Sequence, residues 1–238
     1  MSKTNNVLVV DTTSTACILG IFTREKNFQI QFKDRIRHSR NLVPFIDFIL
    51  DSLDVSIADL SYIFCATGPG SFTGIRIGIA TIQAISYALN IPVIGFSSFD
   101  VWGYTYREMD AVIVPVVDAK MKRFYSAIYY KGKNQSGFLD ISLNDLAEKI
   151  PAGHDVLFCG QDYKQLTDIY QNKSGQGIIE IPGNTQYLNP ELLFQYGQIL
   201  TEKYPDGNEC IPLYLRKSEA EEKLALKIKA ENSGISGE

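Results

Sequence analysis

The chain has 238 residues, of which 45% are apolar and 21% charged, and its formal net charge at pH 7 is −4. These values are typical of a globular protein with one large domain or two of roughly 100–120 residues. The negative charge argues against a general affinity for nucleic acid. The four scattered cysteines include no C-x-x-C pair, which indicates reduced core residues rather than a disulfide framework.

Neither a secretion signal nor a membrane span is expected. Residues 1–6 are polar and short, and no apolar run approaches the ~20 residues that span a bilayer. We therefore expect a cytoplasmic protein that does not associate with a membrane.

The first half of the chain predicts three strands followed by helix, strand, helix, strand and helix. The expected elements are strands at 7–10, 16–22 and 28–36, a helix at 41–53, a strand at 62–66, a helix at 74–89, a strand at 93–96 and a helix from 97 or 98 to about 106. The short, continuously apolar runs indicate strands buried on both faces. The first turn carries Asp11, Thr12 and Thr13, which are residues that favour turns.

A glycine-rich turn at 68–71 leads into the helix at 74–89. Either Ser71 or Thr73 can cap this helix by accepting a hydrogen bond from a free backbone N–H. Such a turn can bind an anion through outward N–H groups, but for a lone glycine-rich turn a tight strand-to-helix connection is the favoured interpretation. It is not a P-loop, because no Gly-Lys-Ser/Thr follows, and it is not a nucleophile elbow, because Ser71 lacks a glycine two residues before it.

The helices at 41–53 and 74–89 are apolar on nearly all sides, so each is expected to be buried in its own domain or covered by a partner. A glycine in a helix interior costs stability. We therefore predict that Gly78 is present because another backbone passes close to it. The expected partner interface comprises Leu42, Phe45, Ile46, Ile49, Gly74, Ile75, Gly78, Ile82 and Ile85.

The second half repeats the same order of elements, with Asp118 at the corner that matches Asp11. The expected elements are strands at 111–117, 123–131 and 137–141, a helix from 142 to about 150, a strand at 156–159, a helix at 161–170, a strand at 178–181 and a helix at 189–203. We expect a first lobe at 1–107, a second at 108–217, and a charged helix with a frayed tail at 218–238.

Several motifs together resemble one family. They are Val9-Val10-Asp11-Thr12-Thr13-Ser14, His38-Ser39, the block from Gly68 to Gly78, Pro92 to Ser98, Asp118-Ala119-Lys120 and Pro212 to Arg216. In this order they resemble the TsaB (YeaZ) family of the actin-like/sugar-kinase/Hsp70 ATPase superfamily. The Gly-Pro-Gly-Ser-Phe-Thr-Gly block is specific, whereas Lys120 departs from the arginine more common in the family.

The resemblance implies an α/β fold of two duplicated actin-like (ribonuclease H-like) βββαβαβα lobes. The first lobe would hold a mixed five-stranded sheet with flanking helices, and the second would be reduced. It further implies a non-catalytic subunit needed to form threonylcarbamoyladenosine next to the anticodon of tRNA. The implied partners are a TsaD-type catalytic subunit, a TsaE-type ATPase and, when the chain is alone, a second copy. The first two long helices would build the partner surface.

Two other functions are open at this stage, a nucleotide-hydrolysing phosphotransferase and, less favoured, a peptidase. The anion or nucleotide loops would comprise Asp11, Thr12, Thr13, Gly68, Gly70, Ser71 and Asp118. We expect both aspartates to form turns, no required cofactor, and at most weak ATP or ADP binding with the partner. No metal site is expected, because the only histidines, His38 and His154, lie far apart in the sequence. A peptidase would need a nucleophile with an assignable base, which the sequence does not offer.

Overall fold

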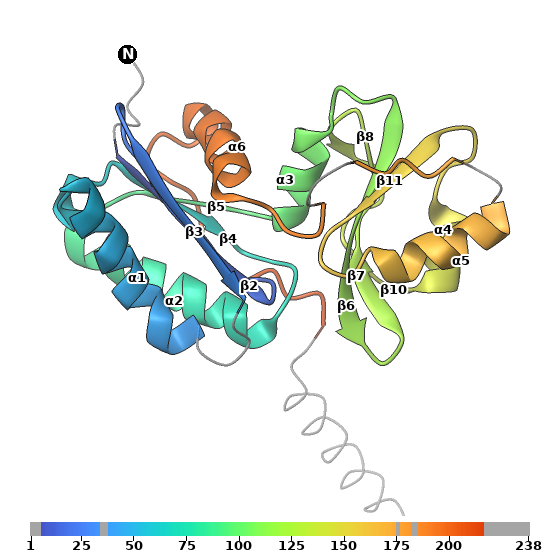
Figure 1. Ribbon diagram of the computed structural model, residues 1–238, viewed down its shortest axis with the longest axis horizontal. Coiled ribbons are helices and arrows are strands. Elements are labelled where there is room, and N and C mark those ends of the chain that lie inside the picture. The colour runs from blue at the N-terminus through green and yellow to red at the C-terminus, as the bar shows by residue number, and fades with distance from the viewer. Residues whose placement is uncertain (1–5, 34–37, 175–176, 182–184, 217–238) are drawn as a thin grey trace, which may run out of the picture.

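The computed structural model describes residues 6–33, 38–174, 177–181 and 185–216, and it shows two α/β lobes side by side (Figure 1). The predicted tail at 218–238 lies outside the described residues.

The first lobe has the predicted order of elements. Its strands are β1 (Val7–Asp11), β2 (Ala16–Phe22), β3 (Asn27–Lys33), β4 (Tyr62–Ala66) and β5 (Val93–Phe96), and its helices are α1 (His38–Leu53), η1 (Ile57–Asp59), α2 (Phe72–Leu89) and α3 (Ser98–Thr105). The five-stranded sheet has the order β3-β2-β1-β4-β5, with β3, β2 and β1 antiparallel and β1, β4 and β5 parallel. The predicted mixed sheet is therefore confirmed.

Two helical layers enclose this sheet. On one face α1 and α2 pack against the strands, and on the other face α6 (Pro190–Lys203) crosses β1, β2, β4 and β5 (Figure 1). β1 is buried on both faces, as its continuous apolar run predicts. The first lobe's core is thus closed by a helix that begins 85 residues after the end of α3 in the sequence.

Local signals explain how α2 begins and ends. The Ser71 hydroxyl accepts a hydrogen bond from Gly74 N–H at 3.2 Å, so Ser71, rather than Thr73, is the N-cap. Asn90 ends the helix in a left-handed conformation with φ 53°. Gly74, Ile75, Gly78, Ile79 and Ile82 form its buried side.

The second lobe is smaller. Its elements are β6 (Ala111–Lys120), β7 (Arg123–Ser126), β8 (Tyr129–Tyr130), β9 (Lys133–Asn134), β10 (Leu139–Ser142), α4 (Leu143–Lys149), β11 (Asp155–Cys159) and α5 (Lys164–Ser174). The sheet follows β10-β7-β6-β8-β9, and β11 pairs with β6. The predicted strand at 123–131 is divided between β7 and β8, and the predicted strand at 178–181 is reduced to one bridge between Val156 and Ile178.

The predicted boundary of the second lobe at 217 needs correction. The segment 205–216 is here called the C-terminal strap. Helix α6 and the strap as far as Leu213 pack on the first lobe. Within the strap, Asn208 N–H donates to Val93 O at 2.8 Å, and its side-chain amide bonds both backbone groups of Gly95. Since these contacts cover the outer edge of β5, residues 190–210 belong to the first lobe.

Candidate functional site

The predicted partner interface faces mostly inward. Leu42, Ile46, Ile49, Ile75 and Ile82 are each at most 1% exposed within this one chain, and they pack in the core between the sheet and helices α1 and α2. Gly74 and Gly78 are buried as well. These seven residues cannot contact a partner directly, because the apolar periodicity that suggested an outer surface marks the side facing the sheet.

Gly74 and Gly78 do mark a close approach, but to a residue of the same chain. A Cβ atom added to Gly74 would overlap the Thr12 carbonyl oxygen, and one added to Gly78 would overlap the Thr12 hydroxyl. That hydroxyl donates a hydrogen bond to the Gly74 carbonyl oxygen at 2.7 Å. The two glycines therefore let the turn after β1 pack directly on α2.

The remaining predicted interface residues, Phe45 and Ile85, are half-buried. The Phe45 ring packs on Phe32 of β3 with ring centroids 4.7 Å apart. Other apolar residues of α1 and α2 have exposed side chains, and one of them, Phe48, also contacts Phe28 of β3. We call them the outer helix face: Val43, Phe48, Ala80, Ala84, Tyr87, Ala88 and Leu89.

The outer helix face presents exposed aromatic rings beside a row of alanines. Phe48 is 52% exposed and Tyr87 93%, and the stripe of Ala80, Ala84 and Ala88 lies at spacings of four residues. Alanines at this spacing allow another helix to approach closely. The four-residue repeat was visible in the sequence, but which side of the helix met the sheet was not.

The Asp11 corner brings together six of the predicted anion-loop residues. Asp11 is 2% exposed and its carboxylate accepts a hydrogen bond from Thr13 N–H at 2.7 Å. Burial raises the pKa of Asp11, and the hydrogen bonds from Thr13 oppose that effect in part. The predicted turn-forming role of this carboxylate is confirmed.

The glycine turn closes this corner instead of presenting an open anion site. Ser71 N–H donates to Thr13 O at 2.6 Å, and a Cβ atom on Gly70 would overlap that same carbonyl group. Gly68 has φ 126°, and Leu213 of the strap lies against it. Because the strap and the chain's own carbonyl groups occupy these positions, an anion would have to displace contacts that already exist.

The Asp118 corner of the second lobe repeats the same turn in a more exposed setting. Lys120 N–H donates to one carboxylate oxygen of Asp118 at 2.7 Å, and Lys120 Nζ pairs with the other at 2.7 Å. Asp118 N–H donates in turn to Asp162 at 2.8 Å. Its predicted turn-forming role is also confirmed.

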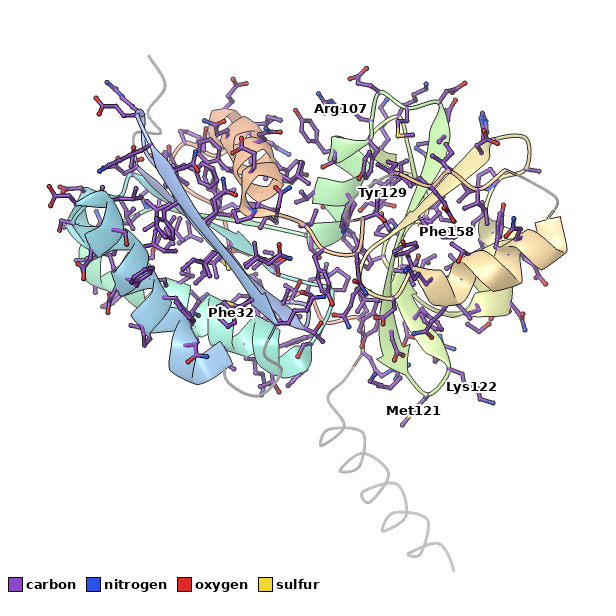
Figure 2. All side chains as sticks on the ribbon, in the orientation of Figure 1. Phe32, Arg107, Met121, Lys122, Tyr129 and Phe158 are labelled. Atoms are coloured by element: carbon purple, nitrogen blue, oxygen red, sulfur yellow. The ribbon has the colours of Figure 1, made fainter. Side chains whose placement is uncertain are left out.

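The hairpin that follows Asp118 has a strained tip. Lys120, Met121 and Lys122 have φ angles of 66°, 54° and 59°, a left-handed conformation that residues other than glycine adopt at a cost. Met121 is 75% exposed, and Figure 2 shows it with Lys122 at the end of the β6–β7 hairpin.

The C-terminal strap connects both corners. Leu213 N–H donates to Thr67 O at 2.8 Å in the first lobe. Three residues later, Arg216 pairs with both carboxylate oxygens of Asp140 at 3.0 and 3.1 Å and donates to Ala119 O at 3.2 Å in the second lobe. A two-pronged pair of this kind fixes geometry as well as charge, so the strap holds the β6–β7 hairpin against the first lobe.

Cysteines and histidines form no site in the part of the chain that the structure describes. Cys17, Cys65, Cys159 and Cys210 are buried free thiols, as the sequence predicts. His154 is half-buried and packs on Tyr130, and the side chain of His38 lies outside the described residues. No group of three His, Cys, Asp or Glu residues among the described ones could hold a metal ion.

One described helix, α2, is long and apolar enough to cross a membrane by length and composition alone. This is weak evidence, because the core helix of a soluble protein meets the same criterion.

The two α/β lobes, each with an aspartate turn at the end of its first strand, define a protein with a duplicated, two-lobed α/β fold. The family model described as TsaD, tRNA N6-adenosine threonylcarbamoyltransferase, matches residues 35–224. A curated relative from Bacillus subtilis, tRNA threonylcarbamoyladenosine biosynthesis protein TsaB, is 31% identical over 91% of this chain and 96% of its own. TsaB of Escherichia coli is 29% identical over 54% of this chain and 56% of its own.

Solved structures agree on the fold. YeaZ from Pseudomonas aeruginosa superimposes with a TM-score of 0.71 at 23% identity, covering 89% of this chain and all of its own. The chain belongs to the TsaB family of tRNA threonylcarbamoyladenosine biosynthesis proteins.

Proposed function

We propose that the chain is a non-catalytic subunit that binds and activates a TsaD-type catalytic subunit through the outer helix face. The single observation that carries this proposal is the exposed apolar surface of α1 and α2, with Phe48 and Tyr87 its largest exposed side chains. Exposed apolar surface of this kind marks a protein–protein contact. The catalytic subunit would in turn modify tRNA, with a TsaE-type ATPase joining the complex in the cytoplasm.

The size of such a contact is sufficient for a stable complex. A standard interface buries roughly 800 Å² per partner. If about half of the total area is apolar, burial contributes ~20 kcal/mol before association costs, which are themselves of order 10 kcal/mol. Exposed charge pairs contribute roughly 0–1 kcal/mol each. We therefore expect binding that depends little on salt, and a homodimer through the same face when the catalytic subunit is absent.

The Asp11 corner supports a non-catalytic role. Its polar groups are already paired: Thr13 N–H donates to the Asp11 carboxylate, and Ser71 N–H donates to Thr13 O. Nucleotide phosphates would compete with these internal hydrogen bonds. We propose that the chain alone needs no cofactor, and that any ATP or ADP is held weakly and with help from the partner.

Phe48→Glu tests the interface, with Ile199→Glu as its matched control. Ile199 is 42% exposed on α6, which covers the opposite face of the same sheet. A charge at Phe48 should weaken binding to the catalytic subunit about thirtyfold, as loss of a central interface residue does, and lower tRNA modification in a reconstituted system. The control should leave both unchanged.

Two results would contradict the proposal. If Phe48→Glu and Ile199→Glu bind the catalytic subunit equally well, the interface lies elsewhere. If the purified chain alone hydrolyses ATP steadily, and Asp11→Ala abolishes that turnover, the phosphotransferase alternative replaces the subunit role.

A further inference from the structure

The two edges of the first sheet differ in how they are covered. At the β5 edge, Asn208 of the strap bonds backbone groups of Val93 and Gly95. At the β3 edge, no described residue outside the sheet forms a backbone hydrogen bond with Asn27, Gln29, Gln31 or Lys33. An open strand edge is a ready template for pairing with another strand.

The hairpin turn determines which groups of β3 face outward. Thr23 N–H donates to Lys26 O at 2.9 Å, which makes these two residues a hydrogen-bonded pair. Because such pairs alternate along an antiparallel ladder, Phe28, Ile30 and Phe32 bond to β2. The N–H and C=O groups of Asn27, Gln29, Gln31 and Lys33 therefore point away from the sheet.

The sequence of β3 is nearly symmetric about Ile30. It reads Asn-Phe-Gln-Ile-Gln-Phe-Lys, so Phe28 and Phe32 lie at equal distances from the centre, as do Gln29 and Gln31. In an antiparallel pair of two β3 strands centred on Ile30, each Phe28 would lie opposite a Phe32 and each Gln29 opposite a Gln31. Lys33 would lie opposite Asn27, so the pairing brings no like charges together.

The side-chain faces suit this pairing. Phe28, Ile30 and Phe32 are half-buried on the side of α1, where Phe28 contacts Phe48 and Phe32 contacts Phe45. A second copy would place its Phe32 beside Phe28 in a pair without hydrogen bonds, where side chains approach most closely. Aromatic pairs across strands stabilise a sheet, and the second copy would cover rings that one chain leaves partly exposed.

We propose that β3 is a self-pairing edge, through which two copies of the chain join their first sheets about a two-fold axis at Ile30. The occupant is a second copy because the near-symmetry of β3 makes the edge complementary to itself, which is the requirement of a two-fold contact. The edge adjoins the outer helix face, because Phe28 contacts Phe48, but its backbone groups belong to β3 alone, and Figure 1 shows β3 at the edge of the sheet between the α1 and α6 layers.

Two double substitutions with the same number of charges test the register. Both are made in the full chain carrying Ala84→Arg, which blocks the outer helix face. In the double variant Gln29→Glu, Gln31→Glu, the charge at position 29 of each copy would lie opposite a like charge at position 31 of the other copy. In Gln29→Lys with Gln31→Glu, the pairs are opposite in sign. Gln29 and Gln31 are exposed, so neither change should affect folding, which circular dichroism can verify.

Sedimentation velocity over a concentration series gives the result. The Glu/Glu variant should dimerise about tenfold more weakly than the Ala84→Arg parent, given the cost of two like-charge pairs, whereas the Lys/Glu variant should dimerise at least as tightly as the parent. Equal dimerisation of the two variants, or a parent that stays monomeric at all concentrations, would overturn the proposal.

A cross-link provides an independent measurement. Across the proposed axis the two Ile30 Cα atoms would be about 4.5 Å apart, within the range that a disulfide bridges. Ile30→Cys should therefore give a covalent dimer under mild oxidation with diamide. Gln31→Cys is the matched control, because position 31 of one copy would lie opposite Gln29, and not opposite position 31, of the other copy. Equal cross-linking of the two variants, or none of either, would contradict the pairing.

Discussion

The Asp11 and Asp118 corners contain the same turn in two different surroundings. In both, a carboxylate at the end of a strand accepts a hydrogen bond from the N–H group two residues later, at 2.7 Å. Asp11 is enclosed by α2 and the glycine turn and is 2% exposed, whereas the Asp118 side chain is 25% exposed and pairs with Lys120. The local sequence fixes the turn, and distant segments decide whether it is a core feature or a surface one.

The largest expected effect is at the contact that encloses the Asp11 corner. Gly74→Val would place side-chain atoms where the Thr12 carbonyl oxygen lies, and overpacking of this kind costs about 1–3 kcal/mol or more. Urea unfolding should show this loss in the free energy of unfolding. Ala84→Leu, on the exposed side of the same helix, is the control. Equal stability of the two variants would show that the first corner is not tightly packed.

An intermediate effect separates the two aspartates. Asp11→Ala leaves the buried Thr13 N–H without an acceptor, which costs about 1–3 kcal/mol. Asp118→Ala removes the partly exposed ion pair with Lys120 and the hydrogen bond from Lys120 N–H. We expect the free energy of unfolding to fall by less than about 1 kcal/mol. Parallel urea titrations at pH 7 measure both. If Asp118→Ala cost as much as Asp11→Ala, the contrast between the corners would not hold.

Asp11→Asn is the charge control for this comparison. Burial raises the pKa of Asp11 above its ordinary value of 3.8, so the folded chain binds the proton more tightly than the unfolded chain. The wild-type free energy of unfolding should fall as pH rises from 3.8 through the raised pKa. In Asp11→Asn the side-chain oxygen can still accept the hydrogen bond from Thr13 N–H, but the side chain does not titrate. The free energy of unfolding of this variant should therefore not fall over the same pH range. If the free energy of unfolding depended on pH in the same way for both proteins, the raised pKa of Asp11 would be contradicted.

The smallest expected effect is at the hairpin tip after Asp118. Met121 has φ 54° and is exposed, so Met121→Gly would relieve an unfavourable backbone conformation. Allowing for the greater flexibility of glycine in the unfolded chain, the net gain should be at most about 1 kcal/mol. A thermal unfolding scan detects it, with Met121→Ala as the control. A loss of stability would show that the methionine side chain makes contacts that outweigh the strain.

Sequence reasoning predicted the features that depend on neighbouring residues. The Ser71 cap, the aspartate turns and the order of elements in the first lobe follow from local patterns, and the structure agrees with them. It did not predict which side of α2 faces the sheet, because Ile82 and Ala84 both lie on apolar rows and only the position of the sheet distinguishes them. For the same reason Gly78 indicated a close neighbour without identifying Thr12.

The return of α6 to the first lobe was hidden for a related reason. The helical pattern at 190–203 is clear in the sequence, but its position after the second lobe suggested that it belongs there. Only the contacts of α6 with β1, β2, β4 and β5 show otherwise. The position of β3 at the sheet edge was likewise not predictable, because the sequence does not show which strands are outermost in a sheet.

The late position of α6 affects how the chain can fold during synthesis. Strands β1 and β2 leave the ribosome early, but the helix that covers one of their faces emerges nearly 170 residues later. Until then Phe22 and Phe64, which pack near Phe194 of α6, have no cover on that side. The second lobe, whose strands and helices are contiguous in the sequence, can fold before the first is complete. A nascent chain released before residue 190 would therefore expose an apolar sheet face and become a substrate for chaperones.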